Sequence, residues 1–228
     1  MDLQRISELL QPFFTNDVCN ALSLEGAFAE PAALSKEQLQ QLSNYLDLLL
    51  RWNSRVNLTA VRQPEEVVAR HFGESLFAAR HLFPSRAQTR ANKRLIDFGS
   101  GAGFPGLPIK ILVPEIELIL VESNQKKATF LREVIRRLKF QAAAVLSDRA
   151  ENLDIRADTV TLRAVERFES SLRIAARLVV SNGRLALLIG EAQVKSAREL
   201  ITDFNWMKPI RIPQSASRVL LVGTATHE

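Results

Sequence analysis

The sequence predicts an α/β fold, a mostly parallel seven-stranded sheet that ends in an antiparallel hairpin. From residue 94 onward, short apolar runs alternate with segments of helical periodicity, which is typical of a parallel sheet covered on both faces. The last two apolar runs, 207–212 and 218–223, are separated by a few residues and must pair antiparallel. We expect residues 1–92 to form a helical extension with a basic segment, and residues 93–228 to form the α/β domain.

Two helices are expected in the extension. Ser35 and Gln38 match the S-x-x-Q pattern of a capping box, and leucines at helical spacing continue the helix to about Trp52. A second helix is expected to begin at Pro64, with two glutamates in its first turn, and to end before Pro84. The polar and basic segment that follows is expected to be a linker.

The α/β domain is expected to contain five strands before the hairpin, with helices between them. Strands are expected at 94–98, 116–122, 142–147, 159–162 and 184–189, and helices at 106–113, 126–139, 170–179 and 192–204. Open sheets of this type bind ligands outside the carboxyl ends of their strands. Polar and glycine residues that directly follow a strand are therefore the candidate site residues.

A glycine-rich turn follows the first expected strand. Gly99, Gly101 and Gly103 give the spacing G-x-G-x-G, whereas dinucleotide-binding loops have G-x-G-x-x-G. Asp97, two residues before the first glycine, would repel a pyrophosphate but could accept hydrogen bonds from an ammonium group. A tight connection without a ligand is the alternative interpretation of such a turn.

Three further strand ends carry candidate residues. Glu122 ends the second strand at the distance from the glycines at which an acidic residue binds ribose hydroxyls. Ala150 and Glu151 follow the third strand, where they would lie beside an adenine, and Arg163 ends the fourth. The alternative for Glu122 is a helix cap or a surface charge, and ordinary loop polar groups or ion pairs would explain Ala150, Glu151 and Arg163 equally well when taken singly. Together with the loop, they indicate a ligand with an ammonium, a ribose and no phosphate, which describes S-adenosylmethionine and predicts methyl transfer.

Basic residues are concentrated in one part of the extension. Residues 1–50 carry a net charge of −5, whereas residues 51–94 carry nine basic against three acidic groups, a net charge of +6. Arg55, Arg62 and Arg70 belong to this segment and are candidates for binding RNA. A solvated helix face is the alternative explanation of the charge.

Several motifs together resemble a known family. They are LIDFGSGAGFPGLP at 95–108, VESNQKKATFLREV at 121–134, SDRAEN at 147–152, LRAV at 162–165 and WNSRVNLTAVRQPEEVVARHFGESL at 52–76. Over residues from about 35 to 190 the chain resembles the ribosomal RNA small-subunit methyltransferase G family, also called glucose-inhibited division protein B. The chain departs from the family pattern at Glu74, where aspartate is usual, and at Ile189, where lysine is frequent.

This resemblance implies a Rossmann-like, S-adenosylmethionine-dependent methyltransferase that methylates N7 of a guanine in 16S ribosomal RNA. The family's cofactor positions correspond to Gly99, Phe104, Ala150, Glu151 and Arg163. The expected substrate is 16S ribosomal RNA, in the small ribosomal subunit or an assembly intermediate. The protein is expected to be cytoplasmic and without membrane contact, because the sequence has neither an export signal nor a long apolar run. It is also expected to be a monomer.

No catalytic acid–base pair or metal site is assigned. Guanine N7 already offers a lone pair, so positioning could supply most of the catalysis. His71 lies on an otherwise apolar helix face and is expected to be a packed, hydrogen-bonded histidine rather than a general base. Cys19, the only cysteine, lies in the extension, away from the expected catalytic domain. Two rival functions remain open, namely an NAD-dependent oxidoreductase and a non-catalytic RNA-binding or assembly factor.

Overall fold

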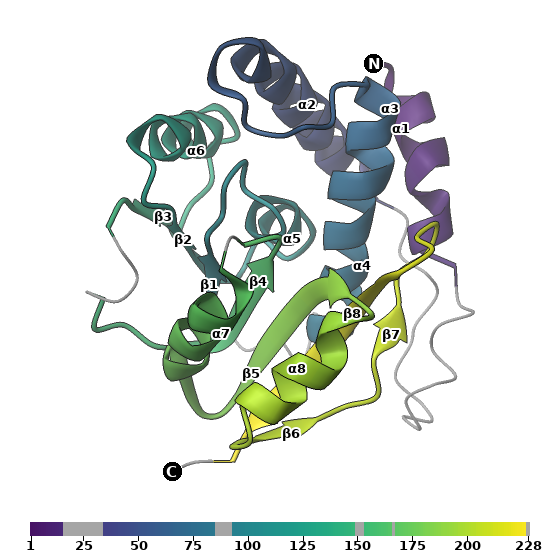
Figure 1. Cartoon of the computed structure of the whole chain (residues 1–228). Coiled ribbons are helices and arrows are strands. Elements are labelled where there is room, and N and C mark those ends of the chain that lie inside the picture. Colours follow the sequence, from purple (N-terminus) through teal and green to yellow (C-terminus); the bar gives the residue numbers. More distant parts are fainter. Residues whose placement is uncertain (16–33, 85–92, 149–152, 166, 227–228) are drawn as a thin grey trace.

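A mixed sheet between two layers of helices forms the centre of the protein (Figure 1). The computed structural model describes residues 1–15, 34–84, 93–148, 153–165 and 167–226. Most of the expected linker at 85–94, together with Cys19, Ala150 and Glu151, lies outside the described residues. In the described part of the chain, none of the helices is long and apolar enough to cross a membrane.

The described residues form an eight-stranded sheet with the order β3-β2-β1-β4-β5-β8-β6, and β7 also pairs with β8. Its strands are β1 Arg94–Phe98, β2 Glu117–Val121, β3 Ala143–Leu146, β4 Ala157–Arg163, β5 Val179–Gly190, β6 Phe204–Trp206, β7 Ile210–Arg211 and β8 Arg218–Ala225. Strands β1 to β5 are parallel, and β8 is antiparallel to β5. The expected parallel sheet with an antiparallel C-terminal hairpin is thus confirmed.

The expected number of seven strands is wrong by one. Within the segment read as one strand at 207–212 only β7 is formed, and the additional strand β6 lies just before this segment; both pair with β8. The chain leaves the ladder between Trp206 and Ile210, a stretch that contains Pro209, which has no backbone N–H to donate.

The helices cover both faces of the sheet. They are α1 Leu3–Leu10, α2 Lys36–Val56, α3 Pro64–Glu66, α4 Glu74–Leu82, α5 Gly106–Leu112, α6 Gln125–Arg137, α7 Phe168–Arg177 and α8 Gln193–Leu200, with the 3₁₀ turn η1 Gln11–Phe13 and the π-helical segment η3 Val67–Gly73. The capping box at Ser35 and Gln38 is present and begins α2. Helix α1 was not among the expected helices.

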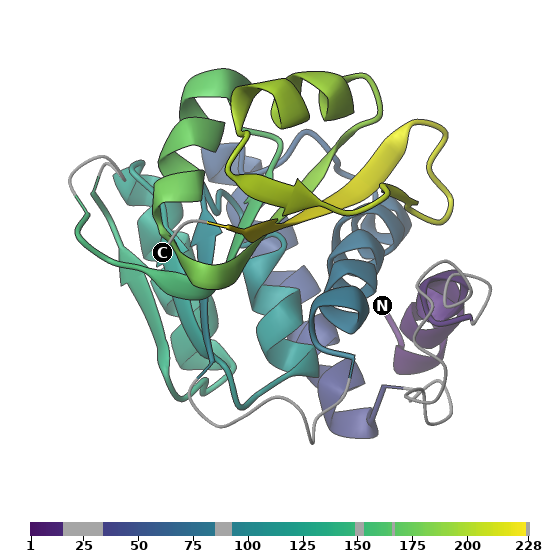
Figure 2. The same cartoon turned by 90° about the horizontal axis from the view of Figure 1, so that it is seen from below.

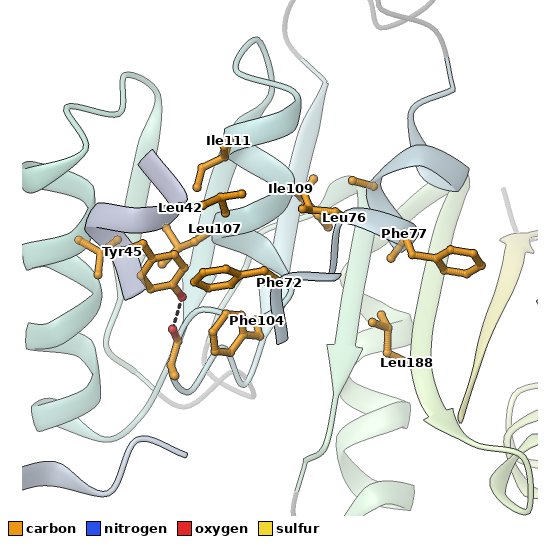
Figure 3. Packing of buried hydrophobic residues seen from close by; sticks show 14 of the residues in the cluster. Leu42, Tyr45, Phe72, Leu76, Phe77, Phe104, Leu107, Ile109, Ile111 and Leu188 are labelled. Atoms are coloured by element: carbon orange, nitrogen blue, oxygen red, sulfur yellow. Dashed lines mark hydrogen bonds between the residues drawn. The ribbon is translucent and has the colours of Figure 1, made fainter. Parts of the chain in front are cut away.

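Alternating side chains of each strand contribute to two separate hydrophobic clusters. In β2, Leu118 and Leu120 face the cluster formed with α1, α2, α4, α5 and α6, whereas Ile119 and Val121 face α7 and α8. Figure 2 shows α7 and α8 on one side of the C-terminal strands and α4 on the other. Figure 3 shows part of the larger cluster, where Tyr45 of α2 donates a hydrogen bond to the carbonyl of Ala102.

The larger cluster joins the N-terminal helices to the α/β part of the chain. Buried residues from Ile6 in α1 to Val222 in β8 belong to it. Residues 1–92 and residues 93–228, which the sequence analysis treats as two parts, therefore contribute buried side chains to the same hydrophobic core. This shared packing fixes α2, η3 and α4 beside the carboxyl edge of the sheet.

Candidate functional site

Three candidate residues meet at the carboxyl edge of the sheet because their strands end in register. Phe98, the last residue of β1, pairs with Val121 on one side and with the residue before Arg163 on the other. The next residues along the strands, Gly99, Glu122 and Arg163, therefore lie side by side. The strand order reverses at β1 and β4, which is the position where open α/β sheets bind their ligands.

The glycine loop turns sharply above this edge. Gly99, Gly101 and Gly103 have φ values of 65°, 55° and 93°, which favour glycine over residues with a Cβ. A Cβ placed on Gly101 would approach nothing closer than the Gly99 carbonyl oxygen at 3.9 Å. The space beside Gly101 is thus open, and its backbone can be approached closely by a ligand.

The Glu122 carboxylate is held rigidly beside this loop. Its Oε2 accepts a hydrogen bond from the Gly101 amide at 2.8 Å, and its Oε1 accepts one from the Asn124 amide at 2.7 Å. The residue is 8% exposed and lines the cleft described below. Since each carboxylate oxygen has two lone pairs, both oxygens retain capacity to accept hydroxyl groups.

Asp97 occupies a different position from the one expected. It is fully buried beneath the loop, its Oδ2 accepts from the Gly106 amide at 3.1 Å, and its Oδ1 accepts from the Thr161 hydroxyl at 2.8 Å. Burial raises its pKa to about 6, against the hydrogen bonds that lower it. Asp97 is not among the described residues that line the cleft, and its contact with a ligand ammonium stays a prediction. Its bond to the Gly106 amide anchors the start of α5 to β1.

A cleft of ≈ 750 Å³ opens over these strand ends, within the size range of small-molecule sites. The glycine loop, Glu122 and Lys127 form one side, and η3, the β4 end and Arg218 form the other. Phe104 and His71 also line the cleft, and their rings are stacked at a centroid distance of 4.6 Å. No group of three His, Cys, Asp or Glu side chains in the described ranges is arranged to bind a metal ion.

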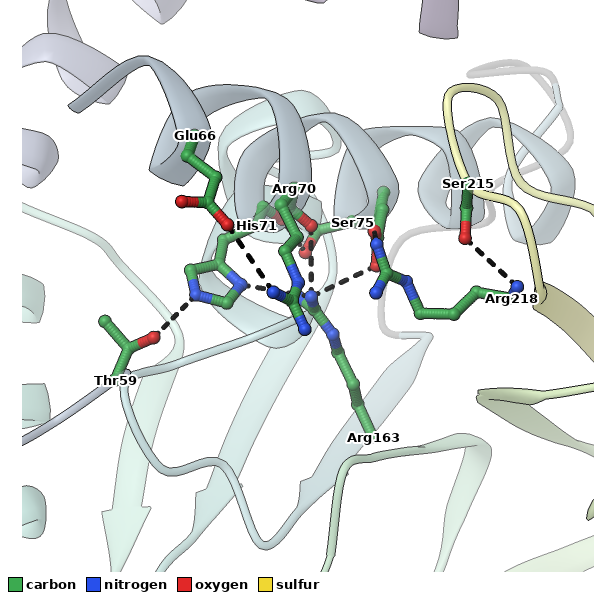
Figure 4. Close-up of polar contacts among 9 residues, drawn as sticks. Thr59, Glu66, Arg70, His71, Ser75, Arg163, Ser215 and Arg218 are labelled. Carbon is green, nitrogen blue, oxygen red and sulfur yellow. Dashed lines mark hydrogen bonds and ion pairs between the residues drawn. The ribbon is translucent and has the colours of Figure 1, made fainter. Parts of the chain in front are cut away.

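The π-helical segment η3 presents Arg70 and His71 to the cleft, as π-bulges at functional sites often do. His71 Nδ1 lies 3.0 Å from Arg163 Nη2, and its Nε2 lies 2.8 Å from the Thr59 hydroxyl (Figure 4). A guanidinium only donates, so Nδ1 accepts and Nε2 carries the proton. Burial, followed by the charge of Arg163, lowers the pKa of His71 to about 2. The expectation of a packed, hydrogen-bonded histidine is confirmed.

Arg163 belongs to a buried ion cluster that the sequence did not reveal. Its Nη2 lies 3.1 Å from the Glu74 carboxylate, whose other oxygen binds Nη2 of Arg218. Figure 4 shows the Arg163 and Arg218 side chains converging on η3 and the start of α4. Glu74 is 1% exposed. No pattern in the sequence around Glu74 or around Arg218, 144 residues away, indicated this cluster.

The three arginines predicted to bind RNA are exposed but lie at different places. Arg55 is in the last turn of α2, and Arg62 is in the loop between α2 and α3. Arg70 alone of these three lines the cleft, where it pairs with Glu66 at 3.5 Å. Asn53 of α2 exchanges hydrogen bonds with the backbone of Thr59 in the same loop.

Comparisons with known proteins agree on one family. Residues 38–215 match the family described as rRNA small subunit methyltransferase G. The chain is similar to proteins named ribosomal RNA small subunit methyltransferase G from Lachnoclostridium phytofermentans (38% identity, covering 72% of this chain and 68% of the other), Xanthomonas euvesicatoria (40%, 75% and 73%) and Chloroflexus aggregans (38%, 89% and 88%).

Solved structures share the fold at low sequence identity. One is the crystal structure of Pyrococcus horikoshii TYW2 in complex with MeSAdo, with a TM-score of 0.56, 15% identity, and coverage of 69% of this chain and 63% of that one. Another is a ribosomal protein L11 methylase from Lactobacillus delbrueckii subsp. bulgaricus, with a TM-score of 0.57, 10% identity, and coverage of 70% and 80%. These likenesses identify a Rossmann-like methyltransferase fold.

Proposed function

Because the chain belongs to the rRNA small subunit methyltransferase G family, an S-adenosylmethionine-dependent family, we propose that the cleft at the carboxyl edge of the sheet is its active site. There the enzyme methylates N7 of a guanine in 16S ribosomal RNA. The observation that carries this assignment is the alignment of Gly99, Glu122 and Arg163, with the Gly101 amide bonded to the Glu122 carboxylate.

The residues in the cleft fit S-adenosylmethionine. Glu122 is positioned to accept the ribose hydroxyls, and the open space at Gly101 leaves room for the ligand against the loop backbone. Gly99, Phe104 and Arg163 also line this cleft, while Ala150 and Glu151 remain expected contacts outside the described residues. When bound, the cofactor supplies an electrophilic methyl group.

The protein's own contribution to the reaction is to orient the guanine. N7 carries an in-plane lone pair, so no proton has to be removed before attack. His71 offers no free lone pair in this arrangement, since Nδ1 accepts from Arg163 and Nε2 donates to Thr59. Correct orientation can supply about 7–11 kcal/mol of the barrier reduction. We therefore assign positioning, rather than general-base catalysis, to this site.

The target guanine must lie in a loop or be extruded from a helix, because side chains cannot reach N7 in the deep major groove of A-form RNA. Exposed Arg55, Arg62 and Arg70 are proposed to bind the adjoining backbone. Replacing all three with Gln should make the salt dependence of RNA affinity less steep, by up to about 0.7 in log–log slope for each lost phosphate contact. An unchanged slope would identify them as a solvated face.

Mass spectrometry of nucleosides tests the proposed function. 16S ribosomal RNA from cells lacking the protein should lack one 7-methylguanosine, and purified protein with S-adenosylmethionine should restore it. Naked RNA, isolated small subunits and assembly intermediates, tested in parallel, identify the substrate form. An identical 7-methylguanosine content with and without the protein would refute the assignment. Binding of S-adenosylmethionine and RNA with no methyl transfer to any of these substrates would instead favour a non-catalytic assembly factor.

A further inference from the structure

Two guanidinium groups in the cleft share a single buried carboxylate. Glu74, with its side chain 2% exposed, binds Nη2 of both Arg163 and Arg218. The neighbouring His71 is neutral, since its pKa is lowered to about 2. Glu74, Arg163 and Arg218 together thus carry a net positive charge at the wall of the cleft proposed to receive RNA.

Both guanidinium groups also contain a nitrogen without a hydrogen-bond partner. These atoms are Nη1 of Arg163 and Nε of Arg218, both buried. The Arg163 side chain is 9% exposed, and that of Arg218 is 29% exposed. Leaving a buried charged donor unpaired is costly, so these donors are explained best by an acceptor that binds from the cleft.

We propose that Arg218 binds an RNA phosphate beside the target guanine, and that Glu74 positions its guanidinium group together with that of Arg163, which remains an expected cofactor contact. Arginine is suited to this ligand because its planar fork matches the geometry of phosphate oxygens. The inference rests on the proposed function, which brings RNA to this cleft. It adds Arg218, a residue beyond the segment 38–215 that matches the family.

The place of Arg218 in the fold supports this role. It begins β8, opposite Gly190 of β5, and its backbone amide is bonded to the Ser215 hydroxyl at 3.0 Å. The antiparallel C-terminal hairpin therefore carries a cation back to the carboxyl edge of the parallel sheet. Nearer the cleft mouth, half-exposed Arg70 lines the same side.

The main test measures RNA affinity against salt concentration for wild type, Arg218→Gln and a matched control. Arg211→Gln is that control, because Arg211 lies on the adjacent strand β7, pairs with Glu191 at 3.2 Å and is not among the described residues that line the cleft. Arg218→Gln should weaken binding about tenfold and make the log–log slope less steep by about 0.7, while Arg211→Gln changes neither. An unchanged slope in folded Arg218→Gln protein would overturn the proposal.

A second experiment tests whether Arg218 binds an RNA phosphate or the carboxylate of the cofactor. The affinities of S-adenosylmethionine and of methylthioadenosine, which lacks the amino-acid part, are measured for each variant without RNA. We expect Arg218→Gln to leave both affinities unchanged. A selective loss of S-adenosylmethionine affinity would assign the site to the cofactor carboxylate and overturn the proposal without affecting the proposed function.

A third arm locates the phosphate on RNA fragments in which one linkage near the target guanine is a neutral methylphosphonate. The methylphosphonate at one particular linkage should weaken RNA binding by the wild-type protein and should not weaken binding by Arg218→Gln protein any further. If no linkage behaves in this way, the proposal is contradicted.

If Arg218→Gln does not fold, Arg218→Lys replaces it, since lysine keeps the charge beside Glu74 but loses the planar fork. That variant should keep the wild-type slope and bind about tenfold more weakly, and wild-type affinity would overturn the proposal.

Discussion

The backbone amide of Gly101 donates a hydrogen bond to the carboxylate of Glu122, 21 residues further along the chain, at 2.8 Å. This bond ties the loop after β1 to the end of β2. The second carboxylate oxygen is bonded to the Asn124 amide, just before α6 begins. One side chain thus fixes the loop and the start of a helix around the place proposed for the ribose.

Glu122→Gln is expected to weaken S-adenosylmethionine binding about tenfold or more, because it removes a charged acceptor and places an NH₂ group where an amide or hydroxyl donates. Glu117→Gln is the control, since Glu117 lies on the same strand β2 but forms an exposed ion pair with Arg94. Calorimetry on both variants checks the expectation. Equal cofactor affinities in Glu122→Gln and Glu117→Gln would remove Glu122 from the site.

Gly101→Val is expected to abolish detectable cofactor binding. The φ of 55° is unfavourable for a β-branched residue, and the new side chain would enter the open space beside the loop. Gly101→Ala, which adds only a Cβ, should have a smaller effect. Calorimetry gives the affinities and circular dichroism confirms folding; a folded Gly101→Val protein with wild-type affinity would show that the loop does not contact the ligand.

Local patterns in the sequence predicted the parts of the fold that local interactions determine. The strand at 94–98 has the expected bounds, and the capping box at Ser35 begins its helix as expected. Contacts between distant segments left no comparable signal. The ion pair of Glu74 with Arg218 depends on how β8 returns to the sheet, and no pattern within either segment indicates it.

Asp97 shows why a motif alone does not determine what a side chain contacts. Its position before the glycines is consistent with binding an ammonium, but side chains alternate along β1 and the packing of α5 decides which atoms cover it. Asp97 is fully buried, and its two oxygens accept hydrogen bonds from the Gly106 amide and the Thr161 hydroxyl. A glycine is required at Gly106, because a Cβ there would lie 2.8 Å from the Asp97 Cβ.

Gly73→Ala is expected to destabilise the protein by detaching the η1 turn. A Cβ at Gly73 would lie 2.3 Å from the ring of buried Phe13, whose carbonyl also accepts a hydrogen bond from Arg80 at 3.0 Å. Phe13→Ala should cost about 3–5 kcal/mol through the cavity that it leaves. Combining Gly73→Ala with Phe13→Ala should relieve the clash, so urea unfolding should show less than additive losses. Fully additive losses would contradict the contact.

His71 is expected to make stability depend on pH below about 6.5. Its folded-state pKa of about 2 lies below the ordinary value of 6.5, so only the unfolded chain takes up this proton as pH falls. Stability is then lost on acidification, by up to about 1.4 kcal/mol per pH unit. Asp97, with its pKa raised to about 6, opposes this between about pH 4 and 6, because the folded state holds that proton more tightly.

Comparison of wild type with His71→Gln isolates the histidine contribution. From pH 5 to 7, the stability of wild type relative to His71→Gln should rise by about 2 kcal/mol and then remain constant. Urea unfolding at each pH measures this difference. A difference that does not vary with pH would contradict the lowered pKa of His71.

The final prediction concerns the chemical step. Single-turnover methyl transfer at saturating RNA and cofactor should show no rise with pH between 6 and 8.5, because the N7 lone pair is available throughout and neutral His71 does not titrate in this range. His71→Gln should therefore retain the chemical step, since glutamine can accept from Arg163 and donate to Thr59 as the imidazole does. Cys19→Ser serves as the control and should behave as wild type. Loss of a general base lowers the rate of the chemical step by about 100- to 10,000-fold. A folded His71→Gln enzyme with unchanged RNA and cofactor affinities whose single-turnover rate falls about 1,000-fold or more would therefore show that His71 acts as a general base, and would contradict catalysis by positioning.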